Sequence, residues 1–124
     1  ADFRPEHTAE QKIKREGDEL VIRLKPTHDI AAALGRMKSA TQLLVGFALE
    51  TDHEQANAEK KLEKKNLDFI VLNSLQNKGT CFQSDENQIS IISHEGQHDY
   101  ERKNKKEVAS DIIDELAKRI TCEQ

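Results

Sequence analysis

The stretch LLVGFALETDHEQANAEKKLEKKNLDFIVLN, residues 43–73, decides the fold. Its two ends, LLVGFAL and FIVL, are continuous apolar runs, which is typical of strands covered on both faces of a parallel sheet. Between them, Ala56, Leu62 and the aliphatic stems of the lysines form a helical stripe. Asp52 can cap the start of this helix, and Glu54 complements its dipole. We therefore predict a right-handed βαβ unit.

Two elements are expected before this unit. Leu20–Lys25 alternates apolar and polar residues, which indicates a strand that is half exposed or paired at an edge. Thr27 or Asp29 can then cap a short helix over Ile30–Lys38, whose apolar side chains fall on one face.

Three more elements are expected after it. Residues 74–87 are rich in Asn, Ser, Gly and Asp and indicate a long functional loop. Gln88–Ser93 predicts a strand, and Gln97–Arg102 can return beside it as a hairpin across the turn at Glu95 and Gly96. Lys105–Thr121 has the apolar spacing of an amphipathic helix.

Composition limits the function classes. The chain has 124 residues, enough for one domain, and its 19 Lys and Arg against 23 Asp and Glu leave a net charge of -4. No global field therefore favours nucleic acid or an anionic membrane. No apolar run approaches the roughly 20 residues that span a bilayer, and the first residues lack a signal-peptide core, so a cytoplasmic protein is expected. Cys81 and Cys122 lack metal-site spacing and are interpreted as free thiols.

Basic and aromatic residues are the first candidates for a binding site. Lys61 and Lys65 are four residues apart, so both can project from one helix face and hold successive phosphates. The alternative is a solvated lysine face. Phe47 lies toward the carboxyl end of a buried strand, where a planar base could stack, or it is a core aromatic.

Acidic residues and motifs add less. Asp29 either caps a helix or binds a cation, and Asp2 could accept a ribose hydroxyl or hold a cation. The sequence has no Walker A motif, no dinucleotide fingerprint and no nucleophile elbow. The first two absences disfavour nucleotide binding through a phosphate loop or a dinucleotide fold, and the third disfavours catalysis by a protein nucleophile.

The segments in order form a more specific pattern. ADFRP, KIKR, THDI, GFALET, AEKKLEKKNLD and SDEN follow one another along the chain. This set resembles the phosphopantothenate–cysteine ligase domain of the bacterial bifunctional coenzyme A biosynthesis protein, which has ADYRP, KIKK, NPDI, GFAAET, ARxKxxxKNLD and GFxSDxN. The likeness covers essentially the whole chain. Thr27 and His28 depart from the pattern, because they replace the usual Asn-Pro before Asp29.

The resemblance implies a chemistry. In that family CTP activates the carboxylate of 4′-phosphopantothenate as an acyl-cytidylate, and the amine of cysteine then displaces CMP. It also implies magnesium as the cation on the triphosphate, whereas FMN would belong only to a decarboxylase domain that this sequence does not contain.

The resemblance also implies roles for individual residues. Lys12 matches a lysine that contacts CTP and matters in the conversion, and Asp2 and Asp29 match residues on the cation side. The positions implied to bind the nucleotide are Asp2, Lys12, His28, Asp29, Ile30, Ala31, Phe47, Lys61 and Lys65.

The expected architecture follows from both lines of reasoning. We predict a three-layer, Rossmann-like α/β domain with a mostly parallel sheet and a β-hairpin, lacking its first βα units. Residues 1–124 would be the C-terminal portion of one ligase domain, carrying much of the CTP site without completing catalysis. The Leu20–Lys25 strand would be part of an arm that pairs across a homodimer. A noncatalytic nucleotide-binding or assembly module on the same scaffold remains the alternative, and a purely structural fragment a third possibility.

Overall fold

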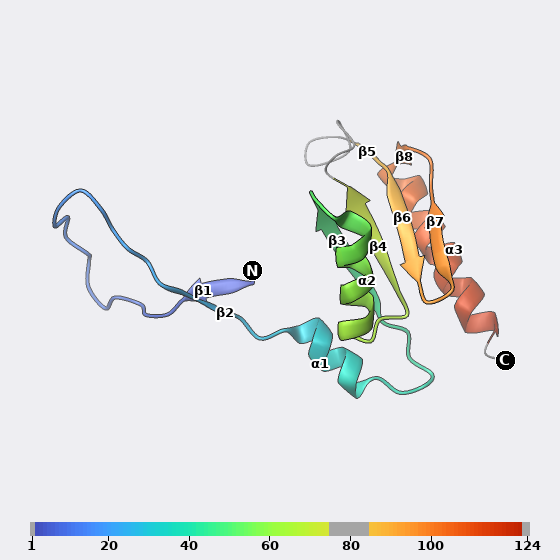
Figure 1. Cartoon of the computed structure of the whole chain (residues 1–124), viewed down its shortest axis with the longest axis horizontal. Coiled ribbons are helices and arrows are strands. Elements are labelled where there is room, and N and C mark those ends of the chain that lie inside the picture. The colour runs from blue at the N-terminus through green and yellow to red at the C-terminus, as the bar shows by residue number, and fades with distance from the viewer. Residues whose placement is uncertain (1, 75–84, 123–124) are drawn as a thin grey trace. The chain divides into compact units, whose positions relative to one another are not determined.

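The computed structural model describes residues 2–74 and 85–122 and forms two compact units, residues 1–30 and residues 31–124 (Figure 1). In the first unit, β1 (Phe3–Pro5) pairs antiparallel with β2 (Leu24–Pro26). The strand expected over Leu20–Lys25 is therefore wrong for most of its length. The ladder is short because each strand contains a proline, which has no N–H to donate. Leu20–Ile22 have no strand partner, and Val21 is 81% exposed.

The second unit contains the predicted βαβ unit. It consists of β3 (Val45–Glu50), α2 (Glu54–Lys64) and β4 (Phe69–Ser74), and the two strands pair in parallel. The register places Val45 opposite Phe69. This arrangement confirms the interpretation of the two apolar runs as neighbouring strands joined by a crossover helix.

Two details of α2 differ from expectation. The N-cap residue is His53, in the left-handed region at φ 46°, and it makes no side-chain capping bond. The carboxylate of Asp52 accepts the N–H of His53 at 2.8 Å instead of capping the helix. The buried stripe consists of Ala58 and Leu62, whereas Ala56 is exposed, because a helix that starts at Glu54 turns Ala58 toward the sheet.

The sheet corrects the expectation of mostly parallel strands. Its order is β3-β4-β6-β7, with β6 at Ile89–Ser93 and β7 at Gly96–Asp99. Only β3 and β4 run parallel, while β6 is antiparallel to both β4 and β7. A parallel return needs a crossover connection, but β6 and β7 are joined by a tight hairpin, which forces opposite directions. The hairpin itself is confirmed.

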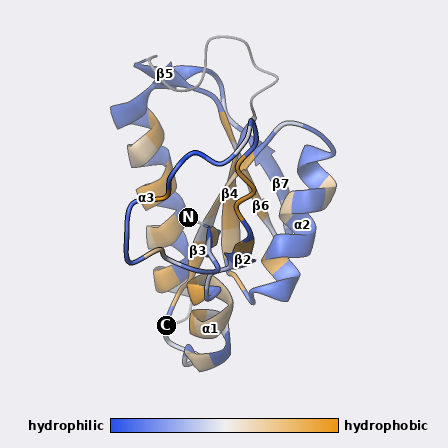
Figure 2. Ribbon diagram, turned by 90° about the vertical axis from the view of Figure 1, so that its left-hand side faces the viewer, coloured by the Kyte–Doolittle hydropathy of each residue, from blue (hydrophilic) through white to orange (hydrophobic). Residues whose placement is uncertain are grey.

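Helices cover both faces of this sheet, which gives three layers (Figure 2). Helix α2 packs on one face and α3 (Lys105–Cys122) on the other. The core on the α2 side is made of Ala48, Ala58, Leu62, Leu67, Ile70, Leu72 and Ile92. The core on the α3 side is made of Phe69, Val71, Ile89, Ile91 and Val108. The Rossmann-like comparison and the missing first βα units stay predictions.

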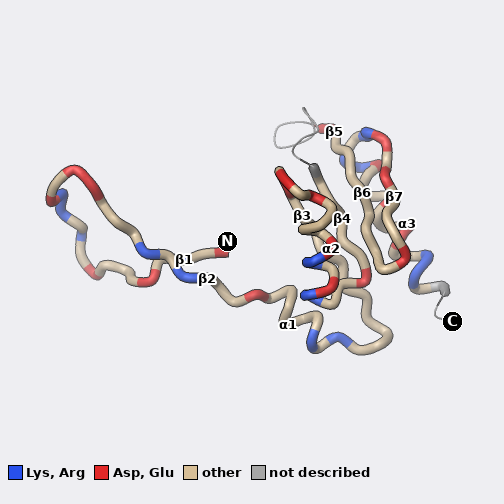
Figure 3. Tube along the Cα trace, viewed as in Figure 1, with Lys and Arg blue, Asp and Glu red and all other residues tan. Residues whose placement is uncertain are grey.

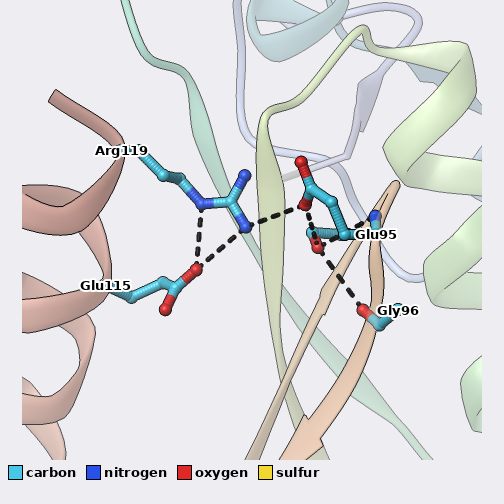
Figure 4. A network of polar contacts seen from close by, with 5 residues as sticks. Glu95, Gly96, Glu115 and Arg119 are labelled. Atoms are coloured by element: carbon cyan, nitrogen blue, oxygen red, sulfur yellow. Dashed lines mark hydrogen bonds and ion pairs between the residues drawn. The ribbon is translucent and has the colours of Figure 1, made fainter. Parts of the chain in front are cut away.

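Polar contacts tie the β6–β7 hairpin to α3 (Figure 4). The Arg119 guanidinium donates to Glu115 at 2.9 Å and to Glu95 at 3.2 Å, and it lies 5.2 Å from the centre of the Phe69 ring. A hydrogen bond from the Ser93 hydroxyl, with the Arg119 charge, lowers the pKa of Glu95 below its ordinary value. This network joins a loop turn to the last part of a helix.

The remaining elements complete the unit. The predicted helix before the βαβ unit is confirmed as α1 (Ile30–Met37), and the predicted last helix is confirmed as α3. Most of the loop expected over residues 74–87 lies outside the described residues. Its end, however, forms β5 (Glu86–Asn87), which pairs antiparallel with β8 (Lys103–Asn104). Within the described residues, no helix combines the length and apolar character needed to cross a membrane.

Candidate functional site

Phe47 lies on an open part of the sheet. Its side chain is 71% exposed, although the neighbouring Ala48 is buried under α2. Alternation along β3 turns Phe47 and Leu49 to the other face, where Leu49 is also exposed, at 42%. The core alternative for Phe47 is therefore wrong. Its ring is available to stack on a planar group, as the stacking hypothesis requires.

Lys61 points toward the carboxyl end of β3. Its ammonium donates to a carboxylate oxygen of Glu50, the last residue of that strand, at 2.5 Å. The other carboxylate oxygen of Glu50 accepts the side-chain amide of Asn57 at 3.4 Å. Figure 3 shows acidic residues at the end of β3 and the lysines farther along α2, toward the end of that helix. The structure thus brings Lys61 to the edge where open α/β sheets bind ligands.

Lys65 occupies a different place. It is the C-cap of α2, and the turn that follows leads into β4, so its backbone lies at the amino ends of the parallel strands. The sequence predicts that both lysines project from one helix face. The two lysines are one helical turn apart, and the backbone N–H of Lys65 donates to the carbonyl oxygen of Lys61 at 3.0 Å. It is therefore the side chain of Lys61, and not its backbone, that reaches the carboxyl edge. Whether the Lys65 ammonium contacts a nucleotide stays a prediction.

The turn around Lys65 is instead a docking point for α1. A Cβ on Gly35 would lie 1.8 Å from the carbonyl oxygen of Lys65, so only glycine allows this approach. Asn66, in the left-handed region at φ 51°, donates its side-chain amide to the carbonyl of Gly35 at 2.8 Å. Gly35 of α1 and the turn after α2 therefore hold the second unit together.

Asp68 is a second structural residue that the sequence did not single out. One of its carboxylate oxygens accepts both the Lys38 ammonium at 2.8 Å and the backbone N–H of Leu44 at 2.6 Å. The Lys38 and Asp68 side chains are only 15% and 24% exposed. This carboxylate fixes the end of α1 and the entry into β3 on the start of β4.

Asp2 and Asp29, the two acidic candidates for a cation site, both lie in the first unit. The backbone N–H of Thr27 donates to the carbonyl oxygen of Asp2 at 2.9 Å, which continues the pairing of β1 with β2. Asp29 follows two residues after Thr27, so both acidic candidates lie near the same end of this hairpin. Among the residues described, no group of three or more His, Cys, Asp or Glu side chains could hold a metal ion. The two aspartates could supply at most part of a coordination shell.

The other candidates in the N-terminal half are more dispersed. Lys12 lies in the irregular segment between β1 and β2, His28 is exposed just before α1, and Ile30 and Ala31 begin α1. Lys12 belongs to the first unit and Lys61 to the second. Their convergence on one ligand stays a prediction.

Asn73 is a further polar residue near the carboxyl end of β4. Its side-chain oxygen is buried, and no described residue supplies a hydrogen bond to it. The register places Asn73 opposite Leu49, on the sheet face that carries Phe47. The sequence could not predict this buried polar atom, because a single Asn at the end of an apolar run is not a recognisable motif.

The fold and these residues define a three-layer α/β domain with a parallel βαβ unit and an open, polar carboxyl edge. The chain belongs to the family described as the DNA/pantothenate metabolism flavoprotein C-terminal domain, which it matches over residues 1–120.

Individual relatives bear different names. A cysteine/cysteine sulfinic acid decarboxylase from an unknown prokaryotic organism is 57% identical over 114 residues, covering 91% of this chain and 32% of that protein. The coenzyme A biosynthesis bifunctional protein CoaBC of Haemophilus influenzae is 40% identical over 119 residues, covering 96% of this chain and 30% of that protein. The chain thus spans about a third of the length of these curated relatives.

Solved structures are also similar. The crystal structure of the C-terminal domain of CoaBC matches with a TM-score of 0.72 and 30% identity, covering 97% of this chain and 50% of that one. This likeness extends over both described units and supports the resemblance found in the sequence.

Proposed function

We propose that this chain supplies much of the CTP site of a phosphopantothenate–cysteine ligase that acts in coenzyme A biosynthesis. The observation that carries the proposal is the family match over residues 1–120, combined with the ordered set of ligase segments. The geometry adds an exposed aromatic ring at Phe47 and a lysine directed to the carboxyl edge of β3 at Lys61.

The reaction needs little covalent chemistry from the protein. The carboxylate of 4′-phosphopantothenate attacks the α-phosphorus of CTP, and pyrophosphate leaves. The amine of cysteine then attacks the acyl carbon, and CMP leaves with the electrons of the broken acyl–phosphate bond. Positioning the reactants and neutralising the phosphates are the main tasks, and lysines perform both.

Each residue receives a role in this proposal. Lys12 is the candidate catalytic residue and binds the nucleotide, and Lys61 and Lys65 hold phosphates. Phe47 lies against the nucleotide. Residues 28–31 wrap around it.

The residues present fit magnesium only if the ion is held jointly by the protein and by the triphosphate of the ligand. When bound, it neutralises charge on the triphosphate. Asp2 and Asp29 would hold it together with phosphate oxygens, since Mg²⁺ commonly uses one or two carboxylates plus the phosphates of its substrate.

The proposal includes a homodimer and a cytoplasmic location. The first unit leaves apolar side chains uncovered, and a concavity of about 710 Å³ is lined by Ile13, Leu20, Val21 and Ile22 among others. A second copy of the chain would cover this surface.

One assay tests the activity. Joined to the N-terminal half of a phosphopantothenate–cysteine ligase domain, the chain should release CMP only when both phosphopantothenate and cysteine are present. Lys12→Ala should abolish this release and leave thermal unfolding unchanged, because Lys12 lies outside the packed cores. CMP release that is independent of cysteine would count against the ligase.

A noncatalytic nucleotide-binding or assembly module is the second candidate. It is favoured by one observation: this segment occurs both in relatives named CoaBC and in a relative whose name gives a different activity. Calorimetric titration separates the candidates. The ligase predicts magnesium-dependent binding of CTP over ATP, the module predicts no preference between them, and a purely structural fragment predicts no binding.

A further inference from the structure

We infer that Glu50 is a positioning residue, which holds the Lys61 ammonium at the carboxyl edge of β3 in the place where it meets the phosphates of the ligand. The inference rests on the proposed nucleotide function and adds a residue that the sequence pattern did not assign to the site. Glu50 acts through Lys61 and is not expected to touch the ligand.

The two side chains are unequally buried. The Glu50 side chain is 13% exposed, and that of Lys61 is 42% exposed. The ammonium has three N–H groups, and one of them reaches Glu50 at 2.5 Å. The buried carboxylate is therefore the fixed partner, and the ammonium keeps donors for a phosphate on its exposed side.

Several contacts keep Glu50 itself in place. It ends β3, where its backbone is paired with Ser74 of β4, and its second carboxylate oxygen meets Asn57 one helical turn before Lys61. Asn57 is fixed in turn by donating to the carbonyl oxygen of Asp52 at 3.1 Å. A strand end and a helix thus determine together where the Lys61 ammonium lies.

Helix geometry explains why Lys61 needs this partner. Long side chains on a helix point back toward its N-terminus, which here is the carboxyl edge of the strands. An unrestrained lysine would sample many rotamers and would have to be ordered when a ligand binds. Glu50 orders it in advance, so less entropy is lost on binding.

Two substitutions separate position from charge. Glu50→Asp keeps the charge but shortens the side chain by one C–C bond, about 1.5 Å, which breaks the contact with Lys61. Glu50→Gln keeps the length and an acceptor oxygen but removes the charge. Glu59→Gln is the matched control, because Glu59 is an exposed carboxylate on the helix that carries Lys61 and accepts a hydrogen bond from the side-chain amide of Gln55 at 2.9 Å.

The experiment titrates the wild-type chain and these variants with magnesium CTP and, separately, with inorganic tripolyphosphate. Glu50→Asp should weaken both probes about two- to tenfold, the range expected for ordering one lysine side chain on binding. Glu50→Gln should bind both probes as tightly as Glu59→Gln does. Thermal unfolding of each variant shows that the titrated protein is folded.

NMR of the Lys61 ammonium measures its protection from solvent exchange. This protection would not change if Glu50 only stabilised the fold. The Lys61 resonance should be protected from solvent exchange in the wild type and in Glu50→Gln, and should lose that protection in Glu50→Asp. Wild-type affinity in a folded Glu50→Asp variant overturns the inference, and so does tighter binding by both Glu50 variants, which would make Glu50 a competitor of the phosphate. If the wild type binds neither probe, the proposed function fails and the inference falls with it.

Discussion

Replacing Gly35 by alanine should detach α1 from the turn that follows α2. The added Cβ would lie 1.8 Å from the carbonyl oxygen of Lys65 and 2.8 Å from its carbonyl carbon. Both are backbone atoms, so no rotamer change relieves the clash. The helix has to move away from the turn, and its polar contacts move with it.

The magnitude can be worked from those contacts. The hydrogen bond from Asn66 to the Gly35 carbonyl is 2.8 Å long, and its loss costs about 1 kcal/mol. Weakening the partly buried Lys38–Asp68 pair costs about 1–2 kcal/mol, and residual overpacking adds about 1–3 kcal/mol. The better helix propensity of alanine returns about 1 kcal/mol. The free energy of unfolding should therefore fall by about 2–5 kcal/mol.

Urea unfolding followed by circular dichroism measures this loss. Met37→Ala is the control, because Met37 is in the same helix but 78% exposed, and it should change the free energy by less than about 0.5 kcal/mol. A Gly35→Ala variant as stable as the wild type would refute the contact between α1 and the turn.

Three more predictions concern other regions. Arg119→Met should lower the free energy of unfolding by about 1–2 kcal/mol, because it removes the ion pairs and the ring contact, and Arg119→Lys should recover only part of this loss in urea unfolding. Hydrogen bonds lower the pKa of Glu95 and Asp99 below 4.5 and 3.8, so their contribution to stability is present above those values and is lost as the pH falls through the lower folded-state values. Carboxyl NMR should therefore show a higher Glu95 pKa in Ser93→Ala, and an unchanged pKa would contradict the role of this hydrogen bond. Val21→Glu should dissociate the proposed dimer in analytical ultracentrifugation without unfolding the second unit, whereas an unchanged mass would exclude this surface as the interface.

The sequence predicted those elements whose signals are local. The apolar runs on either side of α2 gave the parallel pair, and the apolar spacing after Lys105 gave α3. The direction of β6 could not be predicted from local sequence, because it depends on the connection before the strand and on which strand it pairs with. The Leu20–Lys25 pattern alternates correctly, yet β1 is too short to pair with more than its last two residues.

The candidate site was predictable only in part. The exposure of Phe47 depends on how far α3 covers the sheet, so the pattern left stacking and core packing equally open. The pairing of Glu50 with Lys61 spans 11 residues and needs the strand and the helix to lie side by side. The spacing of Lys61 and Lys65 showed a shared helix face, but it could not show that the Lys61 side chain reaches back to Glu50 while Lys65 ends the helix.

The most direct test of the central claim is an NMR titration of the labelled chain with magnesium CTP. If residues from both units converge on one nucleotide, the backbone amides of Lys12, Phe47 and Lys61 should shift together and saturate with a single dissociation constant. ATP at the same concentrations should cause much smaller shifts. Shifts confined to one unit, or equal responses to CTP and ATP, would contradict a shared CTP site.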